Sequence, residues 1–373
     1  LTAAKKALNP NCMMPGFHMV TETPDSPTAS TAVWAITPNG LNLGKRLLEE
    51  IPGAVLFVSE KLERIPASDR VMEIKHLASA IESHFNRFTS HVFIFSTGIA
   101  VRMIASLLKS KLTDPAVAVM DDRGVHVISL VSGHIGGANE LAREAGRITG
   151  AKPVITTATD INGVPAIDML AKEAGLIIDT PENIKHINMA WLNKKKVRLT
   201  DPLGILTPMI SRDLFSEDHG IPTMPHACCS HRIEPVSRET LVLRPRILHV
   251  GIGCNRNTPY SVIAAFLSET FKRAGLAETS IAALATTEIK KDEDGILELA
   301  QAIGLTPVFY SKKELGSVDA IETPSEMVQK HIGVPSVCEA AALLSAGRNN
   351  QRASLILTKQ KNKDVTLAVA MKT

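Results

Sequence analysis

The glycine-rich stretch Ser132–Asn139 holds the residues of this chain that are best suited to chemistry. It lies between the apolar run 125–131, which has the pattern of a strand, and the helix-like run 140–149. A glycine-rich turn at this place lets the backbone approach a ligand, and the N–H groups at the helix start favour an anion. Within the turn, His134 has the side chain that can move a proton near neutral pH. The turn contributes the candidate ligand-contacting residues Ser132, Gly133, Gly136, Gly137 and Asn139.

A second strand end with small polar residues, Thr156–Asp160, follows soon after the first. Two such ends, close in sequence, suggest a single cleft at the carboxyl edge of a parallel sheet, where open α/β proteins place their ligands. Thr157 and Asp160 are therefore candidate ligand contacts. The alternative for His134 is a core histidine bonded to backbone, but its position between two glycines favours the cleft.

The composition is that of a globular protein with more than one domain. With 373 residues, the chain should form two or three domains, because a domain usually takes about 100–200 residues. Hydrophobic residues make up 45% and aromatic residues only 4%, and the abundant Ala, Ile, Leu and Val suit an α/β sheet buried on both faces. The formal net charge of +3 argues against a nucleic-acid partner. The dense basic run 194–196 is interpreted as the solvated end of a helix.

The sequence shows no signal for a membrane or for secretion. No apolar run reaches the roughly 18 residues of a membrane-spanning helix, so no membrane partner is expected. No secretory signal is visible, and the five cysteines are irregularly spaced, which fits the reducing cytoplasm. We therefore predict a cytoplasmic protein. Residues 1–31, rich in Pro, Ser, Thr and Asn, are expected to form a disordered tail.

The order of the predicted elements divides the rest of the chain into three parts. Strands and helices alternate over 32–180, which indicates an N-terminal, open and mostly parallel α/β domain. Within it, the Asp/Gly-rich segment 121–124 predicts a hairpin. Residues 181–243 contain several prolines and little periodicity, and we interpret them as a middle region or linker. Renewed alternation over 244–373 predicts a separate, compact C-terminal α/β domain.

The C-terminal domain opens with a Gly251-Ile252-Gly253 turn that is similar to the start of a dinucleotide fingerprint. Arg256 stands where the third glycine is expected and no P-loop lysine follows, which disfavours a nucleotide site. Two interpretations remain: a tight strand–helix turn, or a ligand turn in which Arg256 binds a carboxylate. Lys290, just past a later strand end, is the ligand-facing candidate of the charged segment 290–293.

Three further motif residues and one cluster have a structural interpretation beside a functional one. Ser336 and Glu339 fit a Ser-x-x-Glu capping box, in which both side chains satisfy N–H groups at a helix start. Cys338 between them has no obvious local histidine to activate it and is interpreted as a packed cysteine. The cluster His226–His231 lacks the spacing of a zinc site, so we interpret it as a surface loop and expect no metal.

Two sets of motifs, in order along the chain, identify a family resemblance. The first set resembles the N-terminal domain of the CbiG cobalamin-biosynthesis family and comprises 96–99, 114–117, 132–139 and 156–160. The second set resembles that family's C-terminal domain, which is related to CobE, and comprises 251–254, 290–293, 335–341 and 359–360. Together they span residues 32–372, whereas the stretch Ala285–Ile289 departs from the family pattern.

This resemblance implies an enzyme, a cobalt-precorrin-5A hydrolase of the oxygen-independent route to vitamin B12. Such an enzyme opens a δ-lactone on the corrinoid macrocycle and releases acetaldehyde, which gives cobalt-precorrin-5B. Cobalt arrives with the substrate, so no protein-bound cofactor or metal is expected. The expected partner is the cobalt-corrinoid substrate, and neighbouring enzymes of the pathway are candidate partners.

The chemistry of lactone opening suggests roles for individual residues. His134 is the candidate general acid or base, with N–H groups around Gly136 and Gly137 as oxyanion donors and Glu339 as the alternative acid or base. The further substrate-binding candidates are Thr97, Gly98, Arg102, Arg256, Lys290 and Ser336. The three cationic side chains among them, Arg102, Arg256 and Lys290, would hold carboxylates of the substrate. A non-catalytic carrier of a tetrapyrrole intermediate and a nucleotide-binding regulatory protein are the alternative functions.

Overall fold

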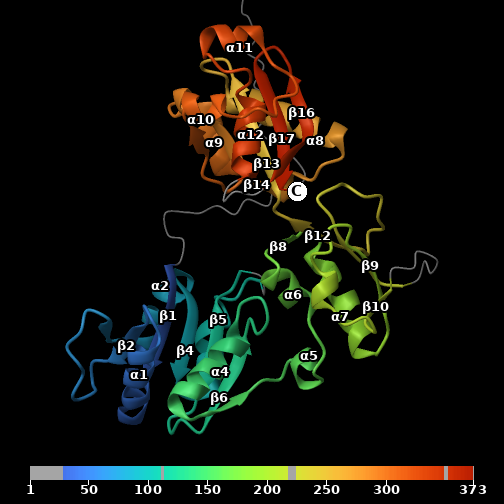
Figure 1. Cartoon of the computed structure of the whole chain (residues 1–373). Coiled ribbons are helices and arrows are strands. Elements are labelled where there is room, and N and C mark those ends of the chain that lie inside the picture. The colour runs from blue at the N-terminus through green and yellow to red at the C-terminus, as the bar shows by residue number, and fades with distance from the viewer. Residues whose placement is uncertain (1–27, 111–112, 217–223, 348–351, 373) are drawn as a thin grey trace, which may run out of the picture. The chain divides into compact units, whose positions relative to one another are not determined.

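A computed structural model describes residues 28–110, 113–216, 224–347 and 352–372. These residues divide into two compact units, which we describe separately (Figure 1). The N-terminal unit runs to Ser230 and includes Pro235–Pro245, and the C-terminal unit takes His231–Glu234 and the chain from Arg246. Residues 1–27 of the predicted tail lie outside the described residues, and β1 already begins at Thr28. Along the described part of the chain, no helix is long and apolar enough to cross a bilayer.

A seven-stranded sheet in the order β3-β2-β1-β4-β5-β6-β7 forms the first part of the N-terminal unit. Its strands are β1 (Thr28–Ala35), β2 (Val55–Ser59), β3 (Val71–Ile74), β4 (Phe88–Ile94), β5 (Ala116–Met120), β6 (His126–Val131) and β7 (Lys152–Val154). Strands β1 to β5 are parallel, as the alternation of strands and helices predicts. The predicted hairpin at 121–124 is confirmed: β6 pairs antiparallel with β5, and β7 runs parallel to β6. The last two strands therefore run opposite to the first five.

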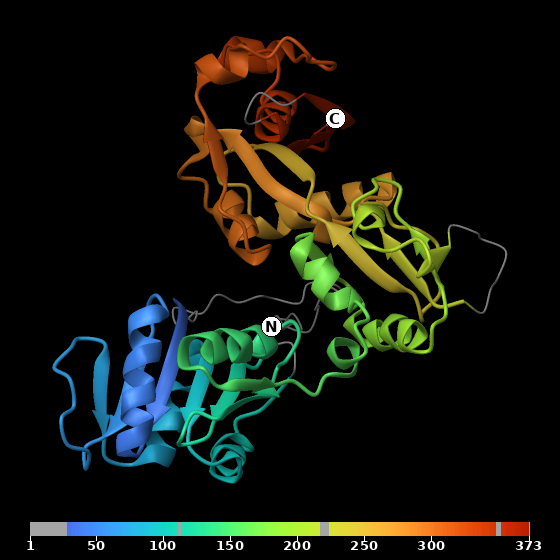
Figure 2. The ribbon, with the colours of Figure 1, turned by 60° about the horizontal axis from the view of Figure 1, so that its bottom comes forward.

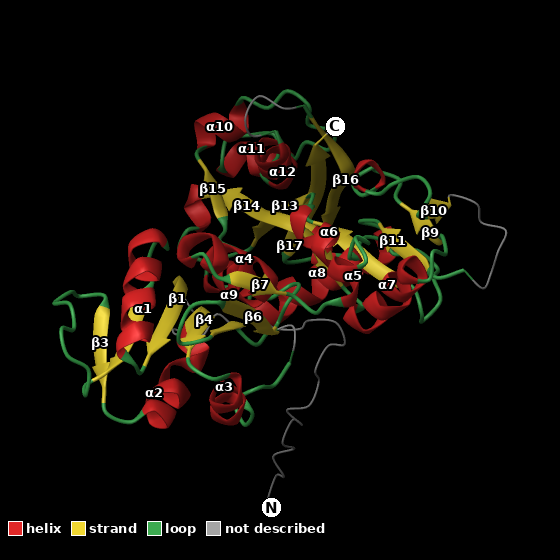
Figure 3. Ribbon diagram, turned by 90° about the horizontal axis from the view of Figure 1, so that it is seen from below, coloured by secondary structure: helices red, strands yellow, loops and turns green. Residues whose placement is uncertain are grey.

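Helices cover both faces of this sheet, and their apolar faces form two cores. They are α1 (Pro38–Glu50), α2 (Leu77–His84), α3 (Thr97–Ile104) and α4 (Ala138–Thr149). α1 and α4 bury Leu47 and Leu141 against one face, whereas α2 and α3 bury Ile81 and Ile104 around Trp34 on the other. Figure 3 shows α1 on the opposite side of the sheet from α2 and α3.

A second sheet, in the order β10-β9-β11-β12-β8, completes the N-terminal unit (yellow-green to yellow in Figure 2). Its elements are α5 (Ala158–Ile161), α6 (Ile167–Glu173), β8 (Leu176–Ile178), α7 (Ile184–Leu192), β9 (Val197–Thr200), β10 (Phe215–Ser216), β11 (His226–Cys229) and β12 (Leu241–Pro245). Trp191 and Leu243 lie in its own hydrophobic core. Of the two interpretations of 181–243, a middle region or a linker, the structure shows a folded middle region. This region also includes α6 and β8, which precede the predicted boundary at residue 180.

The cluster His226–His231 is not a surface loop. β11 lies between β9 and β12, and all four of its residues are buried. The His226 Nδ1 atom lies 2.8 Å from an Arg198 guanidinium nitrogen, and its Nε2 atom lies 2.9 Å from the Thr200 hydroxyl. The interpretation of this cluster as a loop is wrong because a short strand of His, Ala and Cys lacks the Val/Ile signature of a buried strand.

The C-terminal unit contains a five-stranded sheet in the order β15-β14-β13-β17-β16. Its elements are β13 (Leu248–Cys254), α8 (Tyr260–Ala274), β14 (Ile281–Thr287), α9 (Asp294–Ala302), β15 (Val308–Tyr310), α10 (Lys312–Gly316), α11 (Glu326–His331), α12 (Cys338–Ala346), β16 (Ala353–Lys361) and β17 (Val365–Lys372). β13, β14 and β15 are parallel, and the hairpin β16–β17 pairs antiparallel with β13. α8 and α9 cover one face and α12 the other. The predicted α/β fold class is confirmed.

Candidate active site

The turn after β6 holds its shape through its own backbone. Ser132 adopts a positive φ of 59°, and its carbonyl accepts from the N–H of Ala138 at 3.0 Å. A Cβ atom on Gly136 would lie 2.3 Å from Ser132 Cβ, so a glycine is required there for packing. Gly137 has a φ of 90°, with nothing near its absent side chain. Two glycines of the motif therefore serve the geometry of the turn.

His134 lies in this turn between two carboxylates. Its Nε2 atom is 3.3 Å from the Asp160 Oδ2 atom, and its Nδ1 atom is 3.4 Å from the Asp168 Oδ2 atom. The Thr159 hydroxyl also reaches Nε2, at 2.9 Å. Asp160 and Thr159 come from α5, just after β7, whereas Asp168 comes from α6. The imidazole is 20% exposed, so the cluster is open to solvent on one side.

Further side chains hold each carboxylate in place. Asp160 accepts from the Asn139 side-chain amide at 3.0 Å and from the Arg143 guanidinium at 2.7 Å. Asp168 is only 5% exposed and accepts from the Asn188 side-chain amide at 3.1 Å. Side chains of α4 and α7 therefore fix the two carboxylates, Asp160 and Asp168, whose oxygens face His134.

The surroundings of His134 favour its charged form. The hydrogen bond to Asp168, with a smaller contribution from Asp160, outweighs desolvation and raises the pKa of His134 above its ordinary value of 6.5. Burial alone would raise the pKa of Asp168, but hydrogen bonds from His134 and Asn188 lower it below its usual range. The cluster therefore favours an imidazolium between two carboxylates, and an imidazolium is a proton donor.

Residues of the predicted cleft gather around this imidazole. Because β6 and β7 are parallel, the turn after β6 and the segment after β7 meet at one edge of the sheet, as the sequence predicts. The Asn139 amide nitrogen bridges them and donates to Thr157 Oγ1 at 3.1 Å as well as to Asp160. The structure thus brings together Ser132, Gly133, His134, Gly136, Gly137, Asn139, Thr157 and Asp160.

The N–H groups expected to bind an oxyanion are only partly available. The Gly137 N–H donates to the His134 carbonyl at 2.9 Å, so it is engaged within the turn. Within the described residues, the N–H groups of His134, Ile135 and Gly136 have no backbone acceptor. The N–H groups available to a ligand are therefore those of His134, Ile135 and Gly136, not that of Gly137.

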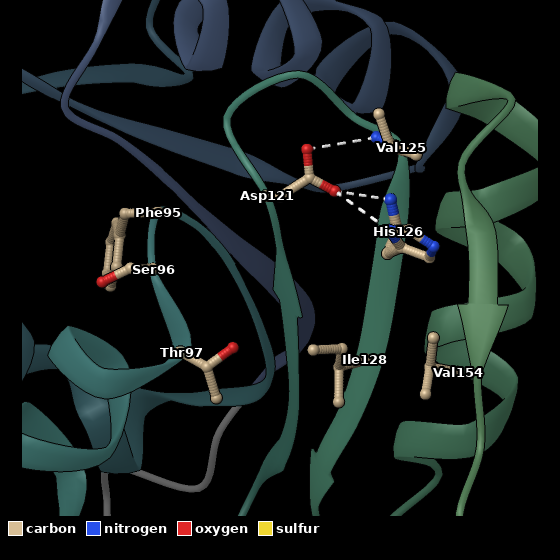
Figure 4. A pocket seen from close by; sticks show the side chains of 8 residues that line it. All are labelled: Phe95, Ser96, Thr97, Asp121, Val125, His126, Ile128 and Val154. Atoms are coloured by element: carbon tan, nitrogen blue, oxygen red, sulfur yellow. Dashed lines mark hydrogen bonds and ion pairs between the residues drawn. The ribbon is translucent and has the colours of Figure 1, made fainter.

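Thr97, Gly98 and Arg102 lie away from this cluster, at the other edge of the sheet. These three residues belong to α3, which follows the carboxyl end of β4. The chain reverses at 121–124, so the His134 turn lies beside the start of β5, at the opposite end of these parallel strands. A pocket of about 470 Å³ opens at this edge, and Figure 4 shows its lining residues Phe95, Ser96, Thr97, Asp121, Val125, His126, Ile128 and Val154. The Asp121 carboxylate there accepts from the N–H groups of Val125 and His126. Thr97, Gly98 and Arg102 therefore lie apart from the predicted cleft, whose two segments 132–139 and 156–160 do meet at His134.

The cationic candidates of the C-terminal unit bind acidic neighbours. Arg256 donates to Asp292 at 2.6 Å, and its guanidinium lies 3.6 Å from Glu293. Lys290 is 9% exposed and donates to Glu293, itself 2% exposed, at 2.7 Å. Both cations stand at the carboxyl ends of β13 and β14, and their charges are largely neutralised within the unit.

Glu339 has a structural place that goes beyond a capping box. Its N–H donates to Ser336 Oγ at 3.4 Å, but its carboxylate reaches other segments instead of the start of α12. It accepts from the N–H groups of Glu322 and Thr323, each at 3.0 Å, and from the N–H of Lys359 at 2.9 Å. Because Glu339 is fully buried, its geometry is that of a clamp between three segments.

Asp168, Arg143 and Asn188 complete the His134 cluster, and none of them was among the residues predicted from the sequence. Arg143 follows Asn139 by one helical turn in α4, and that spacing was a usable signal. Asp168 and Asn188 reach the site through the packing of the second sheet, whose presence the sequence did not predict.

Comparison with known proteins places this architecture in a family. Three family models match in order: Cobalamin synthesis G N-terminal over residues 79–160, Cobalamin biosynthesis central region over 165–245, and Cobalamin synthesis G C-terminus over 248–370. A cobalt-precorrin-5A hydrolase of Priestia megaterium is 33% identical over 359 residues, which cover 91% of this chain and 94% of that protein. The chain belongs to the cobalamin synthesis G family. The cobalt-precorrin-5A hydrolase of Salmonella typhimurium is 34% identical over 334 residues, with 86% of this chain and 93% of that protein covered.

The family's domain order agrees with the sheets described above. The central model of the cobalamin synthesis G family begins at residue 165, just before α6, and so matches the second sheet. A crystal structure of CobE, a protein from the cobalamin (vitamin B12) biosynthetic pathway, covers 35% of this chain and 94% of its own, at 30% identity and a TM-score of 0.33. The predicted resemblance to the CbiG family is confirmed by the three family models and the two hydrolase relatives, and a protein CobE of Sinorhizobium sp is 32% identical to this chain over 124 residues.

Proposed function

We propose that this chain hydrolyses cobalt-precorrin-5A and that the His134 cluster is its active site. The observation that carries the reaction is the 33% and 34% identity to two hydrolases of that name, across 94% and 93% of their lengths. The site is supported by geometry: a proton donor stands beside N–H groups that have no acceptor in the described chain.

In the first step, water adds to the acyl carbon of the lactone, the proton that this water loses passes to solvent, and the acyl–oxygen bond breaks. The His134 imidazolium donates its proton to the leaving oxygen, which becomes a hydroxyl group, while the N–H groups of 134–136 bind the charge on the carbonyl oxygen. Asp168 and Asp160 keep the imidazole oriented during this transfer, since they hold its two nitrogens.

In the second step, the carbon that carries the new hydroxyl leaves the macrocycle as acetaldehyde. The hydroxyl loses its proton, its oxygen forms the aldehyde carbonyl, and the electron pair of the broken carbon–carbon bond stays with the macrocycle. His134 is neutral after the first step and can accept this proton, which restores the imidazolium. One side chain thus acts first as acid and then as base.

The direct test is acetaldehyde release from cobalt-precorrin-5A by the purified full chain. We expect turnover by the wild type and a loss of about 10²–10⁴-fold in His134→Ala, since that is the usual contribution of a general acid–base group. His134→Gln keeps hydrogen-bonding capacity without the titration and should be equally impaired. The exposed His76 provides the matched control, and His76→Ala should keep the wild-type rate.

Two outcomes would contradict the proposal at different levels. Wild-type rates in both His134 variants would remove His134 from the chemistry while leaving the hydrolase intact. Tight binding of the substrate without acetaldehyde from the wild type would instead favour the non-catalytic carrier.

A further inference from the structure

Helix α6 presents two charged side chains to the turn that holds His134. Asp168 and Lys172 are four residues apart, so they lie on the same face of the helix. The Asp168 carboxylate lies 3.4 Å from His134 Nδ1, and the Lys172 ammonium donates to the Ile135 carbonyl at 2.8 Å. One helix of the middle region therefore contacts both the imidazole and the backbone next to it.

The start of α6 is anchored to α7, so these two side chains extend from a fixed backbone. The Ile167 N–H donates to the Asn188 side-chain oxygen at 2.9 Å, and the Asn188 amide donates to Asp168 at 3.1 Å. Ile167 and Ala171 are fully buried in the core under the second sheet. The direction in which α6 presents Asp168 and Lys172 is therefore set by packing within the middle region.

The carbonyl that Lys172 binds is one that the turn's own backbone leaves without a donor. The three carbonyls before it accept from backbone N–H groups later in the turn, at 2.9–3.1 Å; they belong to Ser132, Gly133 and His134. Within the described residues, no backbone N–H donates to the Ile135 carbonyl. Because Ile135 is half-buried, its carbonyl needs a partner, and Lys172 supplies it.

This hydrogen bond sets the direction of a whole peptide group. The described chain contains no cis peptide bond, so the Ile135–Gly136 peptide is planar and trans, and its N–H points opposite to its carbonyl. The Gly136 N–H therefore points away from Lys172, and it has no backbone acceptor in the described chain. His134 Nδ1 faces Asp168, so its Nε2 edge is also turned away from α6.

The charge of Lys172 also affects the strength of this donor. Lys172 is exposed, and no carboxylate of the described residues forms an ion pair with it. A charged donor on a carbonyl oxygen polarises the peptide, which makes the N–H of the same peptide a stronger donor. Lys172 thus acts on both the direction and the strength of the Gly136 N–H.

We propose that Lys172 is a positioning residue for the hydrolysis and that it acts through the Ile135–Gly136 peptide. It holds the Gly136 N–H in the direction in which that group binds the lactone carbonyl oxygen as negative charge develops there. Without the ammonium, the peptide before the permissive Gly136 can rotate and present its carbonyl, which repels that charge. This inference rests on the proposed function, because it takes the N–H groups of 134–136 as the oxyanion donors.

The first test compares kcat and KM for cobalt-precorrin-5A among lysine variants of the full chain. Lys172→Met keeps a helix-forming side chain and should lower kcat about tenfold or more, a part of the roughly 10²–10³-fold cost of losing a whole oxyanion donor. KM should change by less than about twofold, because the ammonium does not bind the substrate. Lys172→Arg can donate to the same carbonyl and should recover most of the rate. The matched control is Lys185→Met, since Lys185 is an exposed lysine of α7, and it should keep the wild-type values.

A second test needs no turnover, because it follows the Gly136 amide in ¹⁵N-labelled protein. The resonance of an amide depends on whether the carbonyl of its own peptide accepts a hydrogen bond. It should therefore move in Lys172→Met, return towards its original position in Lys172→Arg, and stay unchanged in Lys185→Met.

The two tests separate this inference from the proposed function. An unmoved Gly136 amide in Lys172→Met, folded by circular dichroism, would overturn the inference while leaving the hydrolase standing. An unchanged kcat with a raised KM would also overturn it, because Lys172 would then bind the substrate directly. A shifted Gly136 amide without acetaldehyde from the wild type would keep the positioning of the peptide by Lys172 and reject the hydrolase.

Discussion

His134 is held by oxygens on both of its nitrogens, and this arrangement decides which proton transfers it can perform. A histidine with one carboxylate and one free nitrogen is usually a base at neutral pH. Here Asp168 faces Nδ1, and Asp160 and Thr159 face Nε2, which stabilises the protonated ring. The residue is therefore better suited to begin the reaction as an acid.

Replacing Asp168 tests this assignment at the residue scale. Asp168→Asn removes the largest contribution to the raised pKa of His134, so that pKa should fall towards 6.5. A raised His134 pKa stabilises the folded state below pH 6.5, and this stabilisation is lost as the pH rises through the pKa of His134 in the folded state. The stabilisation and its pH dependence should both be smaller in Asp168→Asn. NMR titration of the imidazole measures the pKa, and the alkaline limb of the pH–rate profile should move to lower pH with it.

Asp213→Asn is the control for this experiment, because Asp213 is a fully exposed carboxylate that pairs with Ser211. Its substitution should leave the His134 titration where it is. An unchanged His134 pKa in Asp168→Asn would show that the ion pair seen here does not form in solution.

At the scale of elements, one turn places the start of α3 and the His134 cluster at opposite ends of the strands. The Asp121 carboxylate accepts from the N–H groups of Arg123, Val125 and His126, and so fixes the hairpin that reverses the chain. The sequence predicts this hairpin, but its consequence depends on strand pairing over the whole sheet. β6 and β7 then present their carboxyl ends at the edge where β5 begins. Thr97 and His134 are consequently on opposite edges.

The limits of sequence prediction lie in the second sheet. The strongly periodic strands and helices of the outer parts are recognisable, and so is the meeting of 132–139 with 156–160. The short strands β9 to β12 are not, because strands of two to five residues leave no room for a pattern. Asp168 belongs to that sheet's packing, so its contact with His134 could not be foreseen. The same holds for Glu339, whose partners at 322–323 and 359 come from distant parts of the chain.

Glu339 joins α12 to β16 and to the segment before α11, and this role predicts a loss of stability. Glu339→Gln places an amide NH₂ against N–H donors, so one or more buried donors lose their acceptor. We expect a loss of about 2–4 kcal/mol from the C-terminal unit, measured by calorimetry. Glu326→Gln, at an exposed position in α11, should cost almost nothing.

A different result would return Glu339 to the chemistry. If Glu339→Gln melts like the wild type but releases acetaldehyde far more slowly, the carboxylate acts on the substrate and the clamp is incidental.

At the scale of the whole molecule, each unit contains a desolvated group, and the two groups respond oppositely to acid. His91 in the N-terminal unit is fully buried, accepts from the Trp34 indole and contacts the Phe85 carbonyl; desolvation lowers its pKa to about 4. Glu278 in the C-terminal unit has a pKa raised by burial. The folded state thus binds fewer protons than the unfolded chain at His91 and more at Glu278. Acid weakens the first unit through His91 and strengthens the second through Glu278.

The two tryptophans of the chain, Trp34 and Trp191, both lie in the N-terminal unit, so their fluorescence reports that unit alone. His91 stabilises it fully above pH 6.5, and this contribution falls as pH drops towards the folded pKa of about 4. Between about pH 7.5 and 4.5, the free energy of unfolding in urea should fall by about 2–3 kcal/mol more in the wild type than in His91→Gln, because the glutamine cannot titrate. His134 titrates in the opposite sense in both proteins and cancels in the comparison. Parallel pH profiles for wild type and His91→Gln would mean that His91 is protonated inside the fold, which its two hydrogen-bond contacts, one of them to an indole donor, do not allow.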